Sequence, residues 1–308
     1  FKIDEFAAIT PKIQANQAWN DTTGAGVKVG VIDEYCQITH EDLVENLGEV
    51  VYYSDLDHGY NLYPSDDSQY KHGSWVTGLI SAKGDNNKGV IGVAPNSKFY
   101  FASNVKLLST ETGLEQRTSA SSQVINAINF LVSKGVKVIN MSFGYYVSGS
   151  PSTYNQELLY TTISNAITGK ITFIEASGND NVDVSSYYGP VMAGDGYVYC
   201  NGTNTTPCHD YFSLIPGVIS VSSVNNTDRR SGFSNYGRRI DLSAPGEDIV
   251  TTSYNFNQLT GTLSPTYPIP TSNPRSVFGT SFSAPIVTGA VALLLELKPD
   301  LTPAQVRD

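Results

Sequence analysis

A hydroxyl-bearing segment near the carboxyl end of the chain gives the sequence its clearest chemical signal. Residues 279–285 read Gly-Thr-Ser-Phe-Ser-Ala-Pro and lead into a long apolar run. We predict a buried helix there, with Pro285 in its first turn, where a missing N–H is harmless. Ser281 would then lie at the amino end of the helix, in a positive field that favours an alkoxide or oxyanion. This setting indicates a nucleophile.

A nucleophilic serine is weak at neutral pH unless a base takes its proton, and the chain has only four histidines. His72 begins a helix-like run, His-Gly-Ser-Trp-Val-Thr-Gly, whereas the other three lie in hydrophilic segments. Asp33 follows the apolar run 27–32, which places a carboxylate at the carboxyl end of a buried parallel strand. Asp33, His72 and Ser281 together would suit acyl transfer.

Elements that could position these residues alternate along the chain. Apolar runs typical of strands occur at 27–32, 98–102, 136–141, 171–176 and 218–224, and helical patterns fall near 73–82, 123–132 and 156–168. Such alternation favours parallel strands joined by right-handed crossovers. The expected fold class is α/β, with a mainly parallel doubly wound sheet.

The domain organisation is simple. A chain of 308 residues can bury the core of one large α/β domain, and it contains neither an internal repeat nor a long linker. We therefore predict a single catalytic domain over 1–308, with surface insertions at 53–71, 186–211 and 254–275. Residues 302–305 have the spacing of a helix capping box close to the end of the chain, so we expect the natural protein to continue.

Charge excludes some classes of partner. The net charge of −10 and the pI near 4.8 disfavour a nucleic-acid or anionic-membrane surface. We expect no membrane-spanning run, and the chain opens with Phe1 rather than with methionine and a signal-like segment. These observations predict a processed, soluble protein that is secreted or displayed at the cell surface within a larger polypeptide, and that acts as a monomer.

Four further segments support the same chemistry: Gly-Val-Ala-Pro at 92–95, Val-Ile-Asn-Met-Ser-Phe-Gly at 138–144, Ala-Ser-Gly-Asn at 176–179 and Ser-Ala-Pro-Gly at 243–246. Together with the order Asp33, His72, Ser281, they resemble the subtilase family of subtilisin-type serine proteases, peptidase family S8. The resemblance runs from about residue 18 to residue 295. It implies a subtilisin-like three-layer α/β/α fold.

The resemblance also implies roles for individual residues. Asn179 would donate to an oxyanion together with the Ser281 backbone N–H. An extended polypeptide substrate would pair with one strand end and lie against another. These two substrate-binding segments are Ser142, Phe143 and Gly144, and Ala176, Ser177 and Gly178. An N-terminal propeptide is expected before maturation, so the enzyme would be made as a zymogen.

A structural calcium ion is a second implication. Subtilases often bind Ca²⁺ through an aspartate after the catalytic aspartate and a loop near the histidine helix, and Asp42 and Asn86 match those positions. Oxygen ligands suit this ion, and the loop would add Gly84, Lys88 and Val90. The alternative is an Asn/Asp/Gly turn that holds no ion.

Three departures from the family pattern concern specificity rather than chemistry. Glu175 interrupts the apolar run 171–176, where an unpaired buried carboxylate would be costly, and a structurally paired carboxylate is the alternative interpretation. Trp75 stands where most members carry a second histidine that is not part of the triad. Glu34 follows Asp33 where threonine, serine or aspartate is more usual, and kexin-like members have an acidic residue here that favours basic substrate side chains. A solvated loop carboxylate is the alternative interpretation of Glu34.

The three cysteines divide into a pair and a single residue. Cys200 and Cys208 bracket a polar loop, and a disulfide between them would add about 2–3 kcal/mol if unstrained, which suits an exported protein. Cys36 lies three residues past Asp33 and is either a buried neighbour of the triad or a reactive thiol.

The sequence thus predicts a secreted serine endopeptidase that hydrolyses peptide bonds through an acyl-enzyme. One alternative is a subtilase-like binding or self-processing module within a larger polypeptide. A transpeptidase is another, because it would use the same residues.

Overall fold

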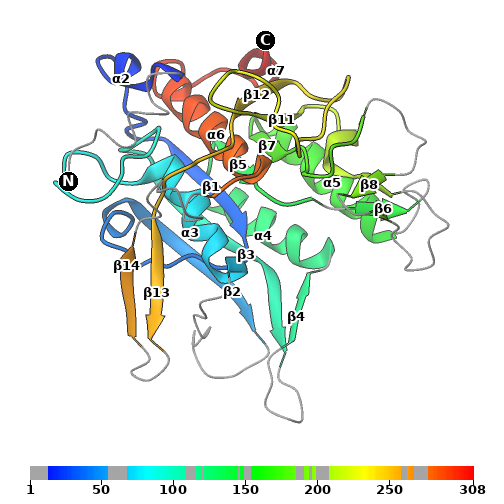
Figure 1. The fold of residues 1–308 in the computed structure, drawn as a ribbon, viewed down its shortest axis with the longest axis horizontal. Helices are drawn as coiled ribbons and strands as arrows, with labels where there is room; N and C mark the ends of the chain where they lie inside the picture. The colour runs from blue at the N-terminus through cyan, green and yellow to red at the C-terminus, as the bar shows by residue number, and fades with distance from the viewer. Residues whose placement is uncertain are drawn as a thin grey trace.

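The structure is a computed structural model that describes residues 13–54, 68–108, 116–119, 121–144, 146–148, 154–184, 191–193, 196–198, 208–257, 262–266 and 277–308. Its centre is a sheet of eight strands (Figure 1). These are β1 (Lys28–Asp33), β2 (Leu47–Ser54), β3 (Lys98–Leu108), β4 (Gln116–Ser119), β5 (Val138–Met141), β7 (Thr172–Ala176), β11 (Val218–Val224) and β12 (Leu242–Pro245).

The strand order is β12-β11-β7-β5-β1-β3-β2, and every pair along it is parallel. Only β4 is antiparallel, and it pairs with β3. After β1 the chain moves to β2 and β3 on one side of β1, and after β5 it moves to β7 on the other side. The connections therefore diverge between β1 and β5, and open α/β sheets place their binding sites at the carboxyl ends of the strands beside such a point.

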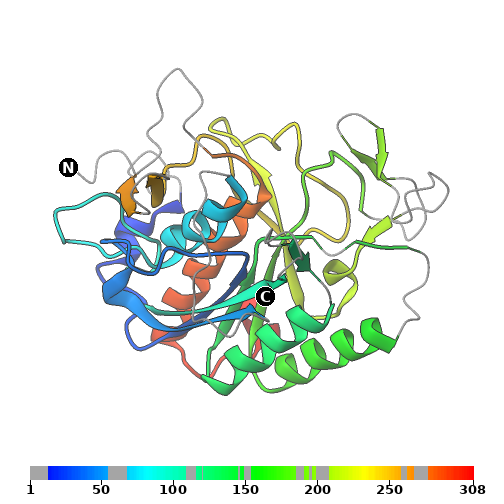
Figure 2. The same ribbon diagram turned by 90° about the horizontal axis from the view of Figure 1, so that it is seen from below.

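Helices cover both faces of the sheet (Figure 2). One core contains buried residues of α3 (Ser68–Ser81) and α6 (Thr280–Leu297) together with residues of the sheet. The other core lies under α4 (Ser121–Ser133) and α5 (Tyr154–Thr168). The expected three-layer α/β/α fold with a mainly parallel doubly wound sheet is therefore present.

Short elements complete the description. They are α2 (Ala15–Ala18), η2 (Val44–Asn46), η3 (Phe212–Leu214), α7 (Pro303–Arg307) and three two-stranded antiparallel pairs: β6 (Tyr146–Ser148) with β10 (Cys208–Asp210), β8 (Val191–Ala193) with β9 (Gly196–Val198), and β13 (Ser253–Asn257) with β14 (Thr262–Thr266). The predicted capping box is present at the start of α7, where the Thr302 side chain accepts from the Gln305 N–H.

Helix α6 corrects two expectations. It begins at Thr280, so Pro285 is its sixth residue and not part of its first turn. It is also 18 residues long with a mean hydropathy of 1.5, so by length and composition alone one helix could cross a membrane. However, 72% of this window is buried inside the protein. That burial is typical of the central helix of a folded domain, which is apolar all round because it is covered all round.

The five predicted strands and the three helices predicted between them are all present, most with end shifts of one or two residues; β3 ends six residues later and α3 starts five residues earlier than expected. The strands β2, β4 and β12 of the central sheet were not predicted. The prediction of a surface insertion over 254–275 is wrong at its first residue, because Tyr254 is fully buried. Its ring lies edge-on to Tyr35 at 6.0 Å between ring centroids, so β13 starts inside the molecule.

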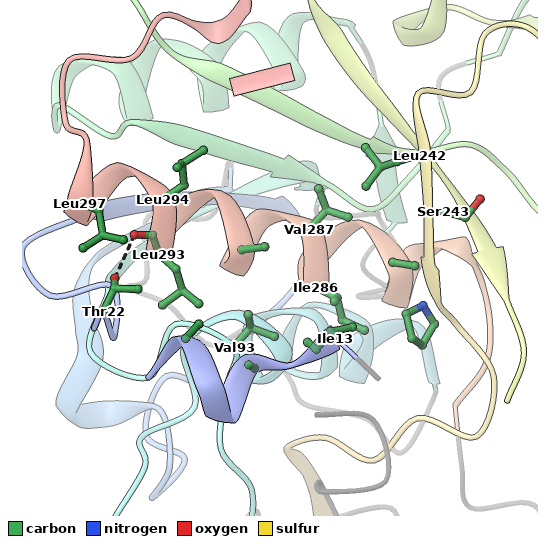
Figure 3. A pocket seen from close by; sticks show the side chains of 15 residues that line it. Ile13, Thr22, Val93, Leu242, Ser243, Ile286, Val287, Leu293, Leu294 and Leu297 are labelled. Atoms are coloured by element: carbon green, nitrogen blue, oxygen red, sulfur yellow. Dashed lines mark hydrogen bonds between the residues drawn. The ribbon is translucent and has the colours of Figure 1, made fainter. Parts of the chain in front are cut away.

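An apolar pocket of about 400 Å³ lies between α2, α6 and β12 (Figure 3). Ile13, Val93, Ile286 and Leu293 are among the side chains that point into it, and the Thr22 hydroxyl closes one end near the Leu293 carbonyl, 2.9 Å away. None of the residues predicted to do chemistry lines this pocket. The candidate active site is therefore elsewhere, at the carboxyl ends of β1 and β5.

Candidate active site

Asp33 and His72 meet at the carboxyl end of β1. Asp33 is the last residue of β1 and is 2% exposed. His72 lies in α3, and its Nδ1 is 2.8 Å from Asp33 Oδ2 and 3.0 Å from Asp33 Oδ1. Because a carboxylate only accepts hydrogen bonds, Nδ1 carries the hydrogen and Nε2 of the neutral ring keeps its lone pair. A proton acceptor is thus oriented by a buried anion.

The electrostatic surroundings favour a protonatable imidazole. Burial lowers the pKa of His72, but the charge of Asp33, the hydrogen bond to Asp33 and the charge of Glu34 all raise it. The net effect is a pKa above the ordinary value of 6.5. The imidazolium that forms when His72 takes a proton is therefore stabilised by the end of β1.

Ser281 is the second residue of α6 and is half-buried. Its hydroxyl donates to the Ser142 carbonyl at 3.0 Å. The next residue, Phe282, has its ring 5.7 Å from the His72 ring, so the base and the serine segment are neighbours. Although both residues are described, no hydrogen bond joins Ser281 to His72. Hydrogen bonds between the acid–base groups of a site are often missing or poorly aligned in unliganded structures.

Pro285 has a consequence for Ser281. A helical residue at this position would donate its N–H to the carbonyl four residues earlier, which is that of Ser281, but proline has no N–H. The Ser142 hydroxyl donates to the Ser281 carbonyl instead, at 2.8 Å. Asn140 Nδ2 in turn donates to the Ser142 hydroxyl at 2.9 Å, and Thr288 Oγ1 lies 3.0 Å from Asn140 Oδ1. The end of β5 therefore fixes the backbone of Ser281.

Asn179 follows β7 and faces the start of α6. Its Oδ1 accepts from the Thr280 backbone N–H at 2.9 Å and from the Thr280 hydroxyl at 3.0 Å. A backbone N–H can only donate, so the atom facing it must be the oxygen, and the amide orientation is unambiguous. Asn179 Nδ2 is consequently turned away from Thr280 and remains available as a donor.

A second donor comes from the helix backbone. Ser281 lies in the first turn of α6, where an N–H has no partner within the helix. Gly279, the residue before the helix, has φ +143°, a conformation that disfavours any side chain, and a Cβ there would lie 3.4 Å from Asn179 Nδ2. Two N–H groups at the amino end of α6 could therefore stabilise an oxyanion.

The two predicted substrate segments flank this site. Ser142 and Ala176 are almost fully buried, and Met141 and Glu175 just before them are register partners in β5 and β7. The Ser142 side chain holds Ser281 rather than facing solvent. Other groups are also used within the protein: the Ser177 N–H donates to the Val221 carbonyl at 3.0 Å.

The remaining members of these segments lie nearer to solvent. Gly144 is exposed and Phe143 is half-buried, with its ring edge-on to Phe212 at 5.6 Å between ring centroids. The Gly178 N–H donates to the Thr280 hydroxyl at 3.2 Å. Of the two segments, 143–144 is thus the better placed to meet an extended chain.

Glu34 is half-buried beside the triad. Its backbone N–H donates to Asp33 Oδ1 at 2.8 Å, and its carbonyl accepts from the Ser103 hydroxyl at 2.9 Å. Its charge contributes to the raised pKa of His72. Glu34 is therefore electrostatically coupled to the site, whatever its role in substrate choice.

The predicted calcium residues lie in two segments that meet, Asp42 after β1 and the loop 84–90 after α3. Asp42 is fully buried, and its two oxygens accept from Asn86 Nδ2 at 2.8 Å and from the Val90 N–H at 2.9 Å. Asn86 Oδ1 accepts from the Lys88 N–H at 3.0 Å. Asp42 forms no ion pair with any described residue, since the ammonium of Lys88 lies 3.4 Å from Glu41 instead.

This donor set fits an oxygen-preferring cation only in part. A buried carboxylate without a cationic partner and a loop with backbone carbonyls are suitable. The Asn86 amide, however, presents nitrogen to Asp42, and it would have to turn its oxygen inward to bind an ion. Within the described residues, no cluster of three or more His, Cys, Asp and Glu side chains could hold a metal.

The cysteines can be placed only in part. Cys200 lies outside the described residues, so the disulfide with Cys208 stays a prediction. Cys36 is free and fully buried, and burial raises the pKa of its thiol to about 12. Burial and a raised pKa both disfavour the thiolate, so they favour the interpretation of Cys36 as a buried neighbour of Asp33 over a reactive thiol.

Sequence reasoning missed several residues around the site. Thr280 holds the Asn179 amide, and Asn140 and Thr288 support the backbone of Ser281. Phe282 packs against His72, as does Trp75, which the sequence marked only as a departure from the family pattern. Thr280 and Asn140 lie within the motifs 279–285 and 138–144, but roles were assigned from the sequence only to other residues of these motifs. The sequence carries no signal for Thr288, because it looks like any residue of an apolar helix.

An Asp–His pair at the end of a central parallel strand, with a serine on a later buried helix, is the arrangement of a subtilisin-type hydrolase. Residues 24–308 match the family model described as Peptidase S8, the subtilase family. The chain belongs to the subtilase family.

Individual relatives agree with this assignment. Subtilisin of Bacillus pumilus is 31% identical over 290 residues, which cover 93% of this chain and 82% of that protein. A probable subtilase-type serine protease of Deinococcus radiodurans is 28% identical over 99% of this chain, which spans only 39% of that relative. The solved structure of a protease from Pseudoalteromonas arctica superposes with a TM-score of 0.65 at 26% identity, covering 94% of this chain and 83% of the other.

Proposed function

We propose that this chain is a serine endopeptidase that cleaves polypeptides through an acyl-enzyme on Ser281. The observation that carries the proposal is the Asp33–His72 pair, which holds an imidazole with its free Nε2 beside the serine segment of α6. Family membership supports the same activity.

In the first half of the reaction, Ser281 Oγ attacks the carbonyl carbon of the scissile bond. His72 Nε2 takes the serine proton, and Asp33 stabilises the imidazolium without becoming protonated itself. The carbonyl oxygen becomes an oxyanion that accepts from Asn179 Nδ2 and from the Ser281 N–H. When the intermediate collapses, the C–N bond breaks, and His72 gives its proton to the departing amine.

In the second half, water replaces the amine. His72 takes a proton from the water as its oxygen attacks the acyl carbon, and the same two N–H donors stabilise the second oxyanion. Collapse breaks the bond to Ser281 Oγ, and His72 returns the proton to the serine. Each half uses the same base and the same donors, so one site serves both.

Substrate recognition would use the strand end at 143–144, with an extended chain adding to it as a further strand. Backbone pairing of this kind depends little on side chains, which suits a protease of broad specificity. Glu34 would add a preference for basic substrate side chains, and its half-buried position next to Asp33 supports this role.

A combined labelling and digestion experiment tests the proposal. We expect a serine-directed fluorophosphonate to label the parent chain once and casein to be digested, and Ser281→Ala to lose both activities while keeping its circular dichroism spectrum. Labelling without casein digestion would favour a self-processing module. Release of peptides joined to an added amine would favour a transpeptidase, and an active Ser281→Ala variant would refute the nucleophile.

We also propose that the protein is secreted, matures by removal of an N-terminal propeptide, acts as a monomer, and has a disulfide between Cys200 and Cys208. Two cysteines that bracket a polar loop support the disulfide and an extracellular setting, and the net charge of −10 disfavours a nucleic-acid or anionic-membrane partner. Mass spectrometry with and without reduction, on protein recovered from the culture medium, would test the location and the disulfide together.

A structural Ca²⁺ is the last part of the proposal. Asp42 would supply its carboxylate, Asn86 its amide oxygen, and Gly84, Lys88 and Val90 their carbonyls. The full burial of Asp42 without an ion-pair partner among the described residues supports a cation there. When bound, the ion would tie the loop after α3 to the segment after β1, so its contribution would be to stability and not to the chemical steps.

A further inference from the structure

The catalytic imidazole of His72 forms a closed triangle with two aromatic rings, those of Trp75 and Phe282. The Trp75 and His72 ring centroids are 6.3 Å apart with an interplanar angle of 65°. Phe282 is 5.7 Å from His72 and 6.1 Å from Trp75. Because Phe282 follows the nucleophile on α6, Trp75 contacts both the base and the serine segment. Edge-on and tilted ring pairs at these distances are favourable.

The indole of Trp75 is anchored at its other end. Its Nε1–H donates to the Ser253 hydroxyl at 2.9 Å. Ser253 is the first residue of β13 and is 5% exposed. An indole N–H has one donor direction, so this bond fixes the rotation of the ring as well as its position.

The segment before β13 is attached to the same turn of α3. The Thr251 hydroxyl donates to the Trp75 carbonyl at 2.6 Å, and the Thr252 hydroxyl donates to the Ser74 carbonyl at 2.7 Å. The approach is close enough to require glycine on the helix, since a Cβ at Gly78 would lie 2.2 Å from Thr252 Oγ1. Residues 251–253 therefore hold the turn that carries the indole.

We propose that Trp75 is a positioning residue that holds His72 in reach of Ser281 and shields the imidazole from water, and that Ser253 keeps Trp75 in place. The inference rests on the proposed function, because it concerns the base of that reaction. Trp75 touches neither substrate nor reacting atoms in this role. It acts through the imidazole ring, whose edge it covers.

Removing the indole should also change how His72 titrates. The charged groups that raise the pKa of His72 are Asp33 and Glu34 at the end of β1, and the two rings that pack against it, those of Trp75 in α3 and Phe282 in α6, are neutral. On its own helix, the ammonium of Lys71 lies 5.7 Å from the Tyr254 ring centroid. Burial lowers the pKa of His72 while both carboxylates raise it. Exposing the ring would weaken the lowering effect, so the pKa would rise further.

The test compares four variants with the parent enzyme. Trp75→Ala removes the ring, Trp75→Phe keeps a ring without the N–H, Ser253→Ala removes the acceptor, and Trp75→Phe/Ser253→Ala closes a double-mutant cycle. The matched control is Trp19→Phe. The Trp19 Nε1–H donates to the Val93 carbonyl at 2.9 Å, so this variant loses a similar bond away from His72.

We expect Trp75→Ala to lower kcat by about 10²-fold with little change in KM, as misplacement of a catalytic group does. The acid limb of its kcat/KM profile should move to higher pH. Trp75→Phe and Ser253→Ala should each lower kcat ~3–10-fold, the effect of one hydrogen bond, and the double variant should lose no more than either. Trp19→Phe should lower stability and leave both kcat and the acid limb unchanged.

A direct titration keeps this inference separate from the proposed function. In the inactive Ser281→Ala background, NMR should show a higher pKa for His72 when Trp75 is replaced by alanine, and an unchanged pKa with phenylalanine. A parent kcat and an unmoved His72 titration in Trp75→Ala would overturn the role of Trp75. Additive effects of Trp75→Phe and Ser253→Ala would overturn the role of Ser253. Absence of hydrolysis by the parent enzyme would instead refute the proposed function.

Discussion

We expect Glu296, near the end of α6, to stabilise the folded state in a pH-dependent way. A single carboxylate oxygen, Oε2, accepts from the backbone N–H groups of Thr23 at 2.8 Å, Gly24 at 2.6 Å and Ala25 at 3.0 Å. The Thr22 hydroxyl lies 2.7 Å from the same oxygen and shares its one hydrogen with the Leu293 carbonyl. These contacts join the loop before β1 to the helix that carries Ser281.

The magnitude follows from the number and exposure of these bonds. A hydrogen bond to a charged group contributes about 1.5–3 kcal/mol when buried. Here three backbone bonds share one oxygen, the site is partly open to water, and Ala25 is exposed, so the total must be discounted. We expect Glu296→Ala to cost ~2 kcal/mol of unfolding free energy and Glu296→Gln, which keeps a neutral acceptor, ~1 kcal/mol.

The pH dependence has a definite sign. Burial raises the pKa of Glu296, but the hydrogen bonds from Thr22, Thr23, Gly24 and Ala25 lower it, and the net shift is below the ordinary value of 4.5. A group whose pKa is lower in the folded state binds its proton more readily after unfolding. Its contribution is therefore complete above pH 4.5 and is lost as the pH falls through the folded-state pKa.

Urea unfolding in the inactive Ser281→Ala background, which avoids autolysis, would measure this effect. The difference in unfolding free energy between the protein with Glu296 and the Glu296→Gln variant should be constant from pH 7 to pH 5. It should shrink when the pH falls below the ordinary glutamate pKa of 4.5. Glu45→Gln is the matched control, because Glu45 is exposed and its carboxylate has no partner among the described residues. If Glu296→Gln did not change the unfolding free energy at pH 7, or if its effect stayed the same at acidic pH, the proposed stabilising role of Glu296 would be refuted.

Three further predictions concern the site itself. Asn179→Ala should lower kcat about 10²–10³-fold with little change in KM, the loss known for the same donor in subtilisin, and a pure KM effect would assign Asn179 to substrate binding instead. A chelator should lower the Tm of the parent enzyme and have much less effect on Asp42→Ala, and identical melting curves with calcium and with chelator would contradict the proposed ion. Glu34→Gln should reduce kcat/KM for Lys- or Arg-containing peptides more than for neutral ones, by about 0.2–1 kcal/mol and less in high salt, and should move the acid limb to lower pH because the charge of Glu34 raises the pKa of His72. An unchanged substrate ratio would leave Glu34 as a solvated loop carboxylate.

Much of the fold was accessible from the sequence because the central strands are buried on both faces. Continuous apolar runs therefore marked β1, β5, β7 and β11 with small errors at their ends. The strand β2 was not predicted because Gly48 and Glu49 interrupt its run of apolar residues. The structure shows why a glycine is needed there: a Cβ at Gly48 would lie 2.6 Å from the Tyr100 ring of the neighbouring strand β3.

The residues that hold Asp33, His72, Asn179 and Ser281 in place were harder to predict from the sequence. Asp33, His72, Asn179 and Ser281 are recognisable because each lies in a short, strongly patterned segment. Their supports are pairs distant in the sequence: Trp75 and Ser253 are 178 residues apart, and Thr288 and Asn140 are 148 apart. A single serine or threonine in an apolar strand or helix carries no local sign of its partner, so only the three-dimensional fold identifies the pair.

The position of Pro285 inside α6 shows how the rule that places proline in the first turn of a helix can fail near a candidate site. Proline inside a helix costs about 3 kcal/mol, largely because a carbonyl loses its partner, so the sequence favoured a helix start close to Pro285. In the structure the helix begins five residues earlier, and the carbonyl left without a helical partner is that of Ser281. The Ser142 hydroxyl, just after β5, donates to this Ser281 carbonyl, and the Ser142 carbonyl accepts from the Ser281 hydroxyl. Ser281 is thus hydrogen-bonded to Ser142 through both its backbone carbonyl and its side chain, and the first of these bonds uses the carbonyl that Pro285 leaves without a helical partner.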